Sequence, residues 1–262
     1  MNQISVSFLV YSLTIPALIA PAFGVFLYLK TKKLSSFYLL LLCIVFSTYA
    51  ILDLGSWFPN PAISLGTWSV LDIFSTSFFI LSFWFLYTFV KERDLPMWLK
   101  VLTASALVPT LVITASSINL NLFFGPSVSG LENQSVTNYN SILDFFFIFV
   151  VMVFSAVEYF KAKDPLSKKK MALSGIGIVV FLFVFCIVLT ISNFIIAINF
   201  LGLGANAYVY TIDLYSLFGM PIFLTFLGYL IAKYQVFDIK LIKSVAYMVA
   251  LMVLLFVGLF FA

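Results

Sequence analysis

The sequence predicts an all-α integral membrane protein: a seven-helix transmembrane bundle with its amino terminus outside, plus a truncated eighth transmembrane helix. Two observations support this fold class. The first is composition, because 63% of the 262 residues are apolar and only 9% are charged, whereas soluble domains carry about 25% charged residues. The second is the placement of the charges, which stand in short clusters between long apolar runs.

Apolar runs of membrane-spanning length recur along the chain. A bilayer core of about 30 Å needs roughly 20 helical residues, since each adds about 1.5 Å. Strands of a β-barrel, about ten residues each with alternating polarity, do not fit such runs. We expect seven spans and the beginning of an eighth, at about 6–29, 35–58, 67–90, 97–119, 139–160, 171–196, 207–232 and 245–262.

The positive charges set the orientation of these spans. Every Lys and Arg lies at the end of span one, three, five or seven or just beyond it, and the opposite connections contain none. Because cytoplasmic loops are enriched in Lys and Arg, we expect these four clusters to be cytoplasmic. The clusters are Lys30, Lys32 and Lys33; Lys91, Arg93 and Lys100; Lys161, Lys163, Lys168, Lys169 and Lys170; and Lys233, Lys240 and Lys243.

Four aspartates lie inside the predicted spans, near the end opposite the lysines. Asp53, Asp72, Asp144 and Asp213 are each about four to six residues from the outer boundary, a depth of roughly 6–9 Å. One interpretation is an electronegative vestibule that binds a cation, an amine-bearing ligand or protons. The other is four separate carboxylates, three of them in the first turns of helices, where the helix dipole favours negative charge. Asp53 is harder to explain in this way, because it lies near a helix C-terminus.

Charged residues at the lysine-rich end have simpler interpretations. Glu158 precedes Lys161 by three residues, a spacing that predicts an ion pair on one helix face. The connection 161–170 carries five lysines and one aspartate. Such a segment attracts anionic lipid headgroups, and the residues we assign to headgroup contact are Lys168, Lys169 and Lys170.

Several prolines fall inside the predicted spans, namely Pro16, Pro21, Pro109 and Pro221. A proline in a transmembrane helix leaves a backbone carbonyl without its donor and bends the helix. The segment from Gly219 to Pro221 lies between Asp213 and the basic cluster that follows span seven. We therefore interpret Gly219 and Pro221 as a candidate hinge that relays a signal along the seventh span.

Enzyme chemistry is disfavoured by the residues that are missing. The sequence contains no histidine, which removes His-based zinc sites and the common Ser–His and Cys–His nucleophiles. Its two cysteines, Cys43 and Cys186, lie deep inside apolar runs, where they are expected to fill space between helices. We expect no catalytic residue, no cofactor, no metal and no nucleic-acid partner.

The end of the seventh span carries the most specific pattern. Residues 219–242, GMPIFLTFLGYLIAKYQVFDIKLI, resemble the seven-helix amino-terminal sensory region of bacterial membrane histidine kinases. The matching positions are Lys233, Tyr234, Phe237, Asp238 and Ile239. The resemblance covers most of residues 1–243 and implies a receptor module, in a bacterial plasma membrane, that drives a cytoplasmic kinase or response regulator, commonly as a homodimer. Lys233, Tyr234, Phe237 and Asp238 would then belong to the signal relay.

The sequence departs from this family in one respect, and a second functional interpretation competes with the receptor. No kinase follows in this sequence, so we expect residues 244–262 to lead to a ninth helix and an effector beyond Ala262. The competing interpretation is a small-solute or ion transporter, which requires a polar path through the middle of the membrane. The midplane stretches 39–46 and 179–189 are almost wholly apolar, which favours a receptor that binds membrane lipids and a small ligand.

Overall fold

The computed structural model describes residues 6–56, 60–116, 134–200, 223, 224 and 227, and every regular element among them is an α-helix. The helices are α1 (Val6–Thr31), α2 (Leu34–Ser56), α3 (Pro61–Lys91), α4 (Met97–Ala104), α5 (Leu107–Ser116), α6 (Gln134–Lys161) and α7 (Pro165–Phe200). Spans seven and eight and the basic segment between them lie outside the described residues, apart from three helical positions, Phe223, Leu224 and Leu227.

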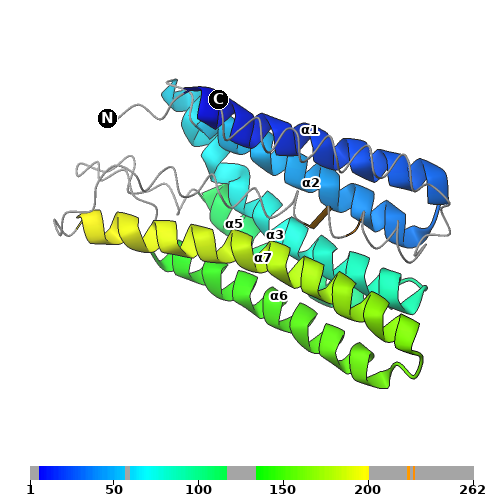
Figure 1. Ribbon diagram of the computed structural model, residues 1–262. Helices are drawn as coiled ribbons and strands as arrows, with labels where there is room; N and C mark the ends of the chain where they lie inside the picture. The colour runs from blue at the N-terminus through cyan, green and yellow to red at the C-terminus, as the bar shows by residue number, and fades with distance from the viewer. Residues whose placement is uncertain (1–5, 57–59, 117–133, 201–222, 225–226, 228–262) are drawn as a thin grey trace.

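Helix α3 is the centre of the arrangement. It packs against α2, α5, α6 and α7, while α1 packs on α2. Figure 1 shows α1 and α2 along one edge, α6 and α7 along the opposite edge, and α3 between them. The long helices run side by side, as expected when short connections join antiparallel neighbours.

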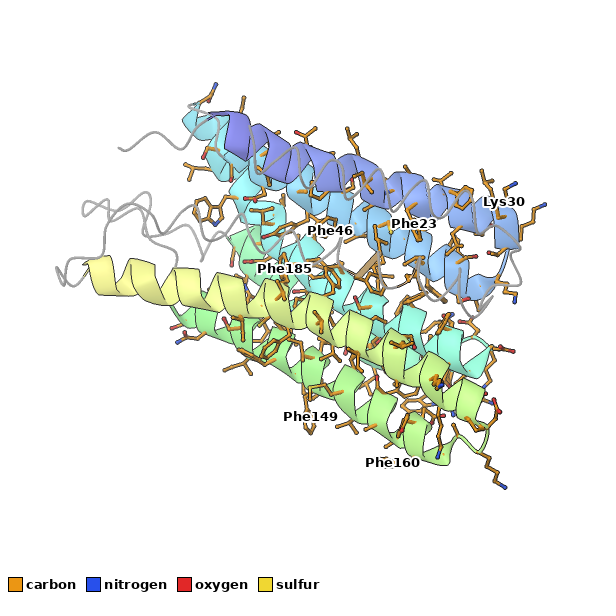
Figure 2. The ribbon with its side chains drawn as sticks, in the orientation of Figure 1. Phe23, Lys30, Phe46, Phe149, Phe160 and Phe185 are labelled. Carbon is orange, nitrogen blue, oxygen red and sulfur yellow. The ribbon has the colours of Figure 1, made fainter. Side chains whose placement is uncertain are left out.

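Helix length and composition indicate a membrane protein. Among the described residues, five segments are long and apolar enough to cross a membrane, and α1 adds the shorter apolar segment Pro16–Thr31. The outer face of α6 exposes large apolar side chains, including Phe149 at 63% and Phe160 at 80%, and both point away from the bundle in Figure 2. An apolar exterior of this kind suits lipid tails rather than water.

The fourth predicted span is interrupted by a proline. Pro109 has no backbone N–H and its ring crowds the carbonyl four residues earlier, so an unbroken helix is disfavoured at Ser105. There α4 gives way to α5: the Ala106 N–H donates to the Thr103 carbonyl at 3.3 Å, and the Val108 N–H donates to the Ser105 carbonyl at 3.0 Å. These three-residue bonds close tight turns and keep the two short helices in one path across the bundle.

Unlike Pro109, Pro21 does not interrupt its helix and lies within the continuous helix α1. The carbonyl that loses its donor there is that of Ala17, four residues earlier. The Ser47 hydroxyl of α2 donates to this carbonyl at 2.5 Å, and Ser47 is buried. A neighbouring helix thus satisfies the backbone group that the proline leaves open, as membrane interiors require.

Aromatic rings fill the middle of the bundle. Phe185 of α7 lies 4.6 Å from Phe78 of α3 and 5.3 Å from Tyr49 of α2, measured between ring centroids. Phe181 packs on Phe46 at 6.2 Å in the same layer. Edge-to-face contacts at these distances are favourable. The buried thiols of Cys43 and Cys186 belong to this core, which confirms that they fill space between helices.

The positive charges gather at one end of the molecule. The connections α1–α2, α3–α4 and α6–α7 all lie at the right-hand end of Figure 1, and Lys30 marks that end in Figure 2. Three of the four predicted basic clusters therefore share one end of the bundle, as the sequence predicts, and the fourth lies outside the described residues.

Candidate ligand site at the acidic end

Two of the four predicted aspartates come together between α3 and α6. Asp144 of α6 is buried, with 7% of its surface exposed, and Asp72 of α3 is half-buried. The two carboxylates are close enough to interact electrostatically. Like charges held together in an environment of low dielectric repel one another strongly. A positively charged ligand is the natural complement of such a pair.

The helix-dipole interpretation of Asp72 and Asp144 is wrong. Helix α3 begins at Pro61 and α6 begins at Gln134, several residues before the boundaries expected from hydropathy. Both aspartates therefore lie about three turns inside their helices. The dipole acts mainly within the first turn, so it does not stabilise either carboxylate.

Three uncharged polar side chains lie on α5 and α6, and sequence reasoning missed them. Buried oxygens of Thr114 and Asn140 have no hydrogen-bond partner among the described residues, and the buried Thr110 hydroxyl lies beside the Tyr139 hydroxyl. Thr110 and Thr114 are four residues apart in α5, and Asn140 precedes Asp144 by four in α6, so each couple shares a helix face. That spacing of polar residues inside apolar runs is the signal that would have found them.

The other two predicted acids are placed differently. Asp53 lies near the carboxyl end of α2, where its Oδ1 is 3.4 Å from the Ser56 hydroxyl. Figure 1 places that end of α2 away from the basic connections. Asp213 lies outside the described residues. Of the four predicted acids, the structure thus brings Asp72 and Asp144 near one another, places Asp53 on a neighbouring helix, and does not test the predicted vestibule.

The proposed relay residues belong to the part of the chain that the structure does not describe. These are Gly219, Pro221, Lys233, Tyr234, Phe237 and Asp238. Phe223, two residues after Pro221, is described and buried. Its ring lies 5.7 Å from that of Phe181 and 6.0 Å from that of Phe85, so this part of the seventh span packs into the aromatic core.

At the basic end, Glu158 joins two helices. Its carboxylate lies 3.6 Å from Lys161 Nζ, which confirms the ion pair expected within one helix. The closer partner is Lys91 at the end of α3, with Nζ 2.6 Å from Glu158 Oε2. Glu158 is buried, so this contact ties α3 to α6, and removing one partner costs more than breaking a surface ion pair.

A second polar network ties α4 to α2 at the same end. Asp94, in the α3–α4 connection, accepts hydrogen bonds from the Tyr38 hydroxyl at 3.0 Å and from Lys100 Nζ at 2.6 Å. The Leu95 N–H also donates to Asp94, at 2.8 Å. Burial alone would raise the pKa of Asp94, but these hydrogen bonds outweigh it and hold the pKa below its ordinary value.

The predicted headgroup lysines begin α7. Lys168 Nζ lies 5.8 Å from the centroid of the Tyr159 ring, a cation–π distance. Lys169 is exposed, whereas the side chain of Lys170 is outside the described set. Lys168 and Lys169 thus lie at the end of the bundle where the other lysines gather, as a headgroup contact requires.

Comparison with known proteins supplies no family for this chain. A scan against protein-family models and searches of curated proteins and of solved structures found no match.

Proposed function

We propose that residues 1–243 form the signal-input domain of a membrane receptor in a bacterial plasma membrane, with its amino terminus outside and its lysine-rich end in the cytoplasm. In this proposal a ligand binds at the acidic end, and the seventh span passes the change to a cytoplasmic kinase or response regulator. The observation that carries the proposal is the Asp72–Asp144 pair, held about three turns inside two helices whose other ends bear the lysines.

The seam between α3 and α6 supports a relay across the membrane. It begins at Asp72 and Asp144, continues through the ring of Phe154, which packs on Phe83 and Tyr87 at 5.8 and 5.5 Å, and ends at the Glu158 ion pair with α3. A ligand shifts such an arrangement only if it binds one state more tightly than the other. Two repelling carboxylates meet that condition, because a cation between them favours their closer approach.

The aromatic midplane supports a receptor over a transporter. A transporter needs polar groups along a path through the centre of the bundle. In the described residues that region is occupied by Phe46, Phe78, Phe181 and Phe185, all fully buried. Interlocking rings of this kind favour transmission of a packing change rather than passage of a solute.

The test combines signalling with solute flux. In membranes carrying the full-length gene product, Asp72→Asn should change kinase output or response-regulator phosphorylation without changing thermal unfolding of the bundle. The matched control is Asp164→Asn, a carboxylate at the opposite end, which should leave output unchanged. Normal responses in Asp72→Asn, or robust solute uptake by liposomes containing the wild-type chain, would contradict the receptor proposal.

A further inference from the structure

We propose that α4 responds to the thickness of the lipid bilayer by tilting about Ser105. The interaction surface is the exposed face of α4, and its partner is the lipid surface at the basic end of the bundle. The inference goes beyond the proposed function, because this signal enters at the end opposite the aspartates and is a property of the bilayer rather than a bound ligand.

The first support is the exposure of one face of α4. None of its eight residues is buried, and Met97 and Trp98 in its first turn are 73% and 67% exposed. Val101 and Leu102, one turn later, continue the same exposed face. Together α4 and α5 form a segment long and apolar enough to cross a membrane, so this first turn lies at the end of a span. Tryptophan prefers that level of a bilayer, where its ring is in an apolar layer and its N–H reaches polar groups.

The second support is the weak attachment of α4 to the rest of the bundle. Helix α4 does not pack along any other described helix, whereas α5 packs on α3. The junction at Ser105 is closed by bonds between residues three apart, such as that from the Ala106 N–H to the Thr103 carbonyl. Such a pattern within a longer helix often marks a hinge, and Pro109 has no N–H with which to restore the regular helix. Helix α4 can therefore tilt about Ser105 while α5 stays in place.

Side chains on the other face of α4 connect it to two helices. The Trp84 indole N–H of α3 donates to the Thr103 hydroxyl at 2.8 Å. Asp94, whose side chain is half-exposed, accepts hydrogen bonds from Lys100 Nζ at 2.6 Å and from the Tyr38 hydroxyl of α2 at 3.0 Å. Lys100 Nζ also lies 5.7 Å from the centroid of the Tyr38 ring. A tilt of α4 therefore acts on both α2 and α3.

The strengths of the two effects are comparable. The net contribution of a single hydrogen bond is modest, and a partly exposed ion pair such as Lys100–Asp94 contributes no more. The cost of hydrophobic mismatch, accumulated over a few ångströms of bilayer thickness, is of the same order. Helix α3 has packed neighbours in α2, α5, α6 and α7, so a change in thickness displaces α4 before it displaces α3.

The experiment uses Trp84 as a reporter of α4, because its N–H bonds to that helix. The full 262-residue chain is labelled with fluorotryptophan and placed in nanodiscs of dimyristoleoyl-, dioleoyl- or dierucoyl-phosphatidylcholine. These lipids share a headgroup and differ in the thickness of the bilayer. Fluorine NMR follows the Trp84 signal, which is assigned by its loss in Trp84→Phe. The signal should shift progressively along the lipid series, and it should shift far less in Thr103→Val, where the indole N–H has no acceptor on α4.

Two variants and a matched control separate a tilt of α4 from a general response to thickness. Trp98→Ala removes the ring at the lipid boundary and should abolish most of the shift. Asp94→Asn loosens the attachment of α4 and should enlarge it. The control is Phe160→Ala, which removes an aromatic ring that is 80% exposed near the end of α6 and should leave the shift unchanged.

Four outcomes would overturn the proposal: a Trp84 signal at the same position in all three lipids, a shift of full size in Thr103→Val, a shift that survives Trp98→Ala, or an equal loss of the shift in Phe160→Ala. Trp98 is exposed, so its replacement leaves the fold intact and the test remains decisive even where Asp94→Asn unfolds. No kinase output enters these measurements. The receptor proposal therefore fails separately, through the output measurements described above.

Discussion

The hydrogen bond from the Ser47 hydroxyl to the Ala17 carbonyl leads to a testable prediction, because it replaces the backbone bond that Pro21 cannot donate. Replacing Ser47 by Ala removes the donor to a carbonyl that Pro21 has already deprived of its helical partner. Both residues are buried, with Ser47 8% and Ala17 2% exposed, so water does not replace the lost bond. An unsatisfied buried carbonyl costs about 1–3 kcal/mol, and interhelical hydrogen bonds in membranes contribute up to about 1.7 kcal/mol. We therefore expect Ser47→Ala to cost about 1–2 kcal/mol.

The reasoning is tested by a double-mutant cycle with Pro21→Ala. Alanine at position 21 restores an N–H that can donate to the Ala17 carbonyl within α1. In that background Ser47→Ala should cost less than about 0.5 kcal/mol, which leaves a coupling energy of about 1 kcal/mol between the two positions. The assay is reversible unfolding in mixed micelles, followed by tryptophan fluorescence. The control is Thr48→Ala, whose hydroxyl donates to the Ile44 carbonyl in the same helix and should show no coupling to Pro21. Equal costs of Ser47→Ala in both backgrounds would refute the proposed compensation.

Three further predictions concern helix contacts and charge. Gly175→Ala should destabilise the bundle by about 1–3 kcal/mol, because a Cβ at this position would lie 2.7 Å from a serine hydroxyl of α6. A Cβ at Gly66 would meet nothing within 4 Å, so Gly66→Ala should be neutral or stabilising by up to about 1 kcal/mol. The same unfolding assay compares the two variants. Lys91→Met should cost about 3 kcal/mol of stability, since it leaves the buried Glu158 carboxylate without its closer partner. Lys161→Met, at a side chain 67% exposed, should cost less than about 1 kcal/mol. A larger loss of stability in Lys161→Met would contradict the conclusion that Lys91 is the main partner of Glu158. The pKa of Asp94 is lowered in the folded chain, so its contacts contribute fully to stability above its ordinary pKa of about 3.9 and are lost as pH falls through the lower folded value. The stability difference between wild type and Asp94→Asn should therefore be constant above about pH 5 and shrink below about pH 4. A difference that grows on acidification would show that the pKa of Asp94 is not lowered by folding.

Hydropathy located the described helices well but misplaced several of their ends. Helices α1 and α2 begin and end within about two residues of the expected spans 6–29 and 35–58. Helices α3 and α6 instead start about six and five residues early, at Pro61 and in the polar stretch that begins at Gln134. A hydropathy window reports what contacts lipid, whereas a helix continues for as long as its backbone bonds are satisfied. Proline also suits the first helical position, as at Pro61, because its missing N–H is not needed there.

Contacts between distant segments could not be predicted from one sequence. The partner expected for Glu158 was Lys161, because spacing along one helix is visible in the sequence. The nearer partner, Lys91, is 67 residues away, and only the packing of α3 against α6 brings it there. The proximity of Asp72 to Asp144 has the same origin. Depth from the membrane boundary suggested that the aspartates lie at one level, but depth does not specify which faces of which helices meet.

The two ends of the α3–α6 seam differ in a way that bears on how a receptor would work. At the basic end opposite charges hold the helices together, with Lys91 and Glu158 at 2.6 Å. At the acidic end Asp144 is buried and lies close enough to Asp72 for two negative charges there to oppose one another. Occupation of the acidic end by a cation removes a repulsion there, while the ion pair at the far end is already formed and gains nothing. In the proposed receptor, the free energy of binding would move the acidic ends of α3 and α6 about the Lys91–Glu158 contact. Breaking that contact with Lys91→Met should accordingly weaken the effect of ligand on output more than the binding of ligand itself, a separation that a merely structural lysine would not produce.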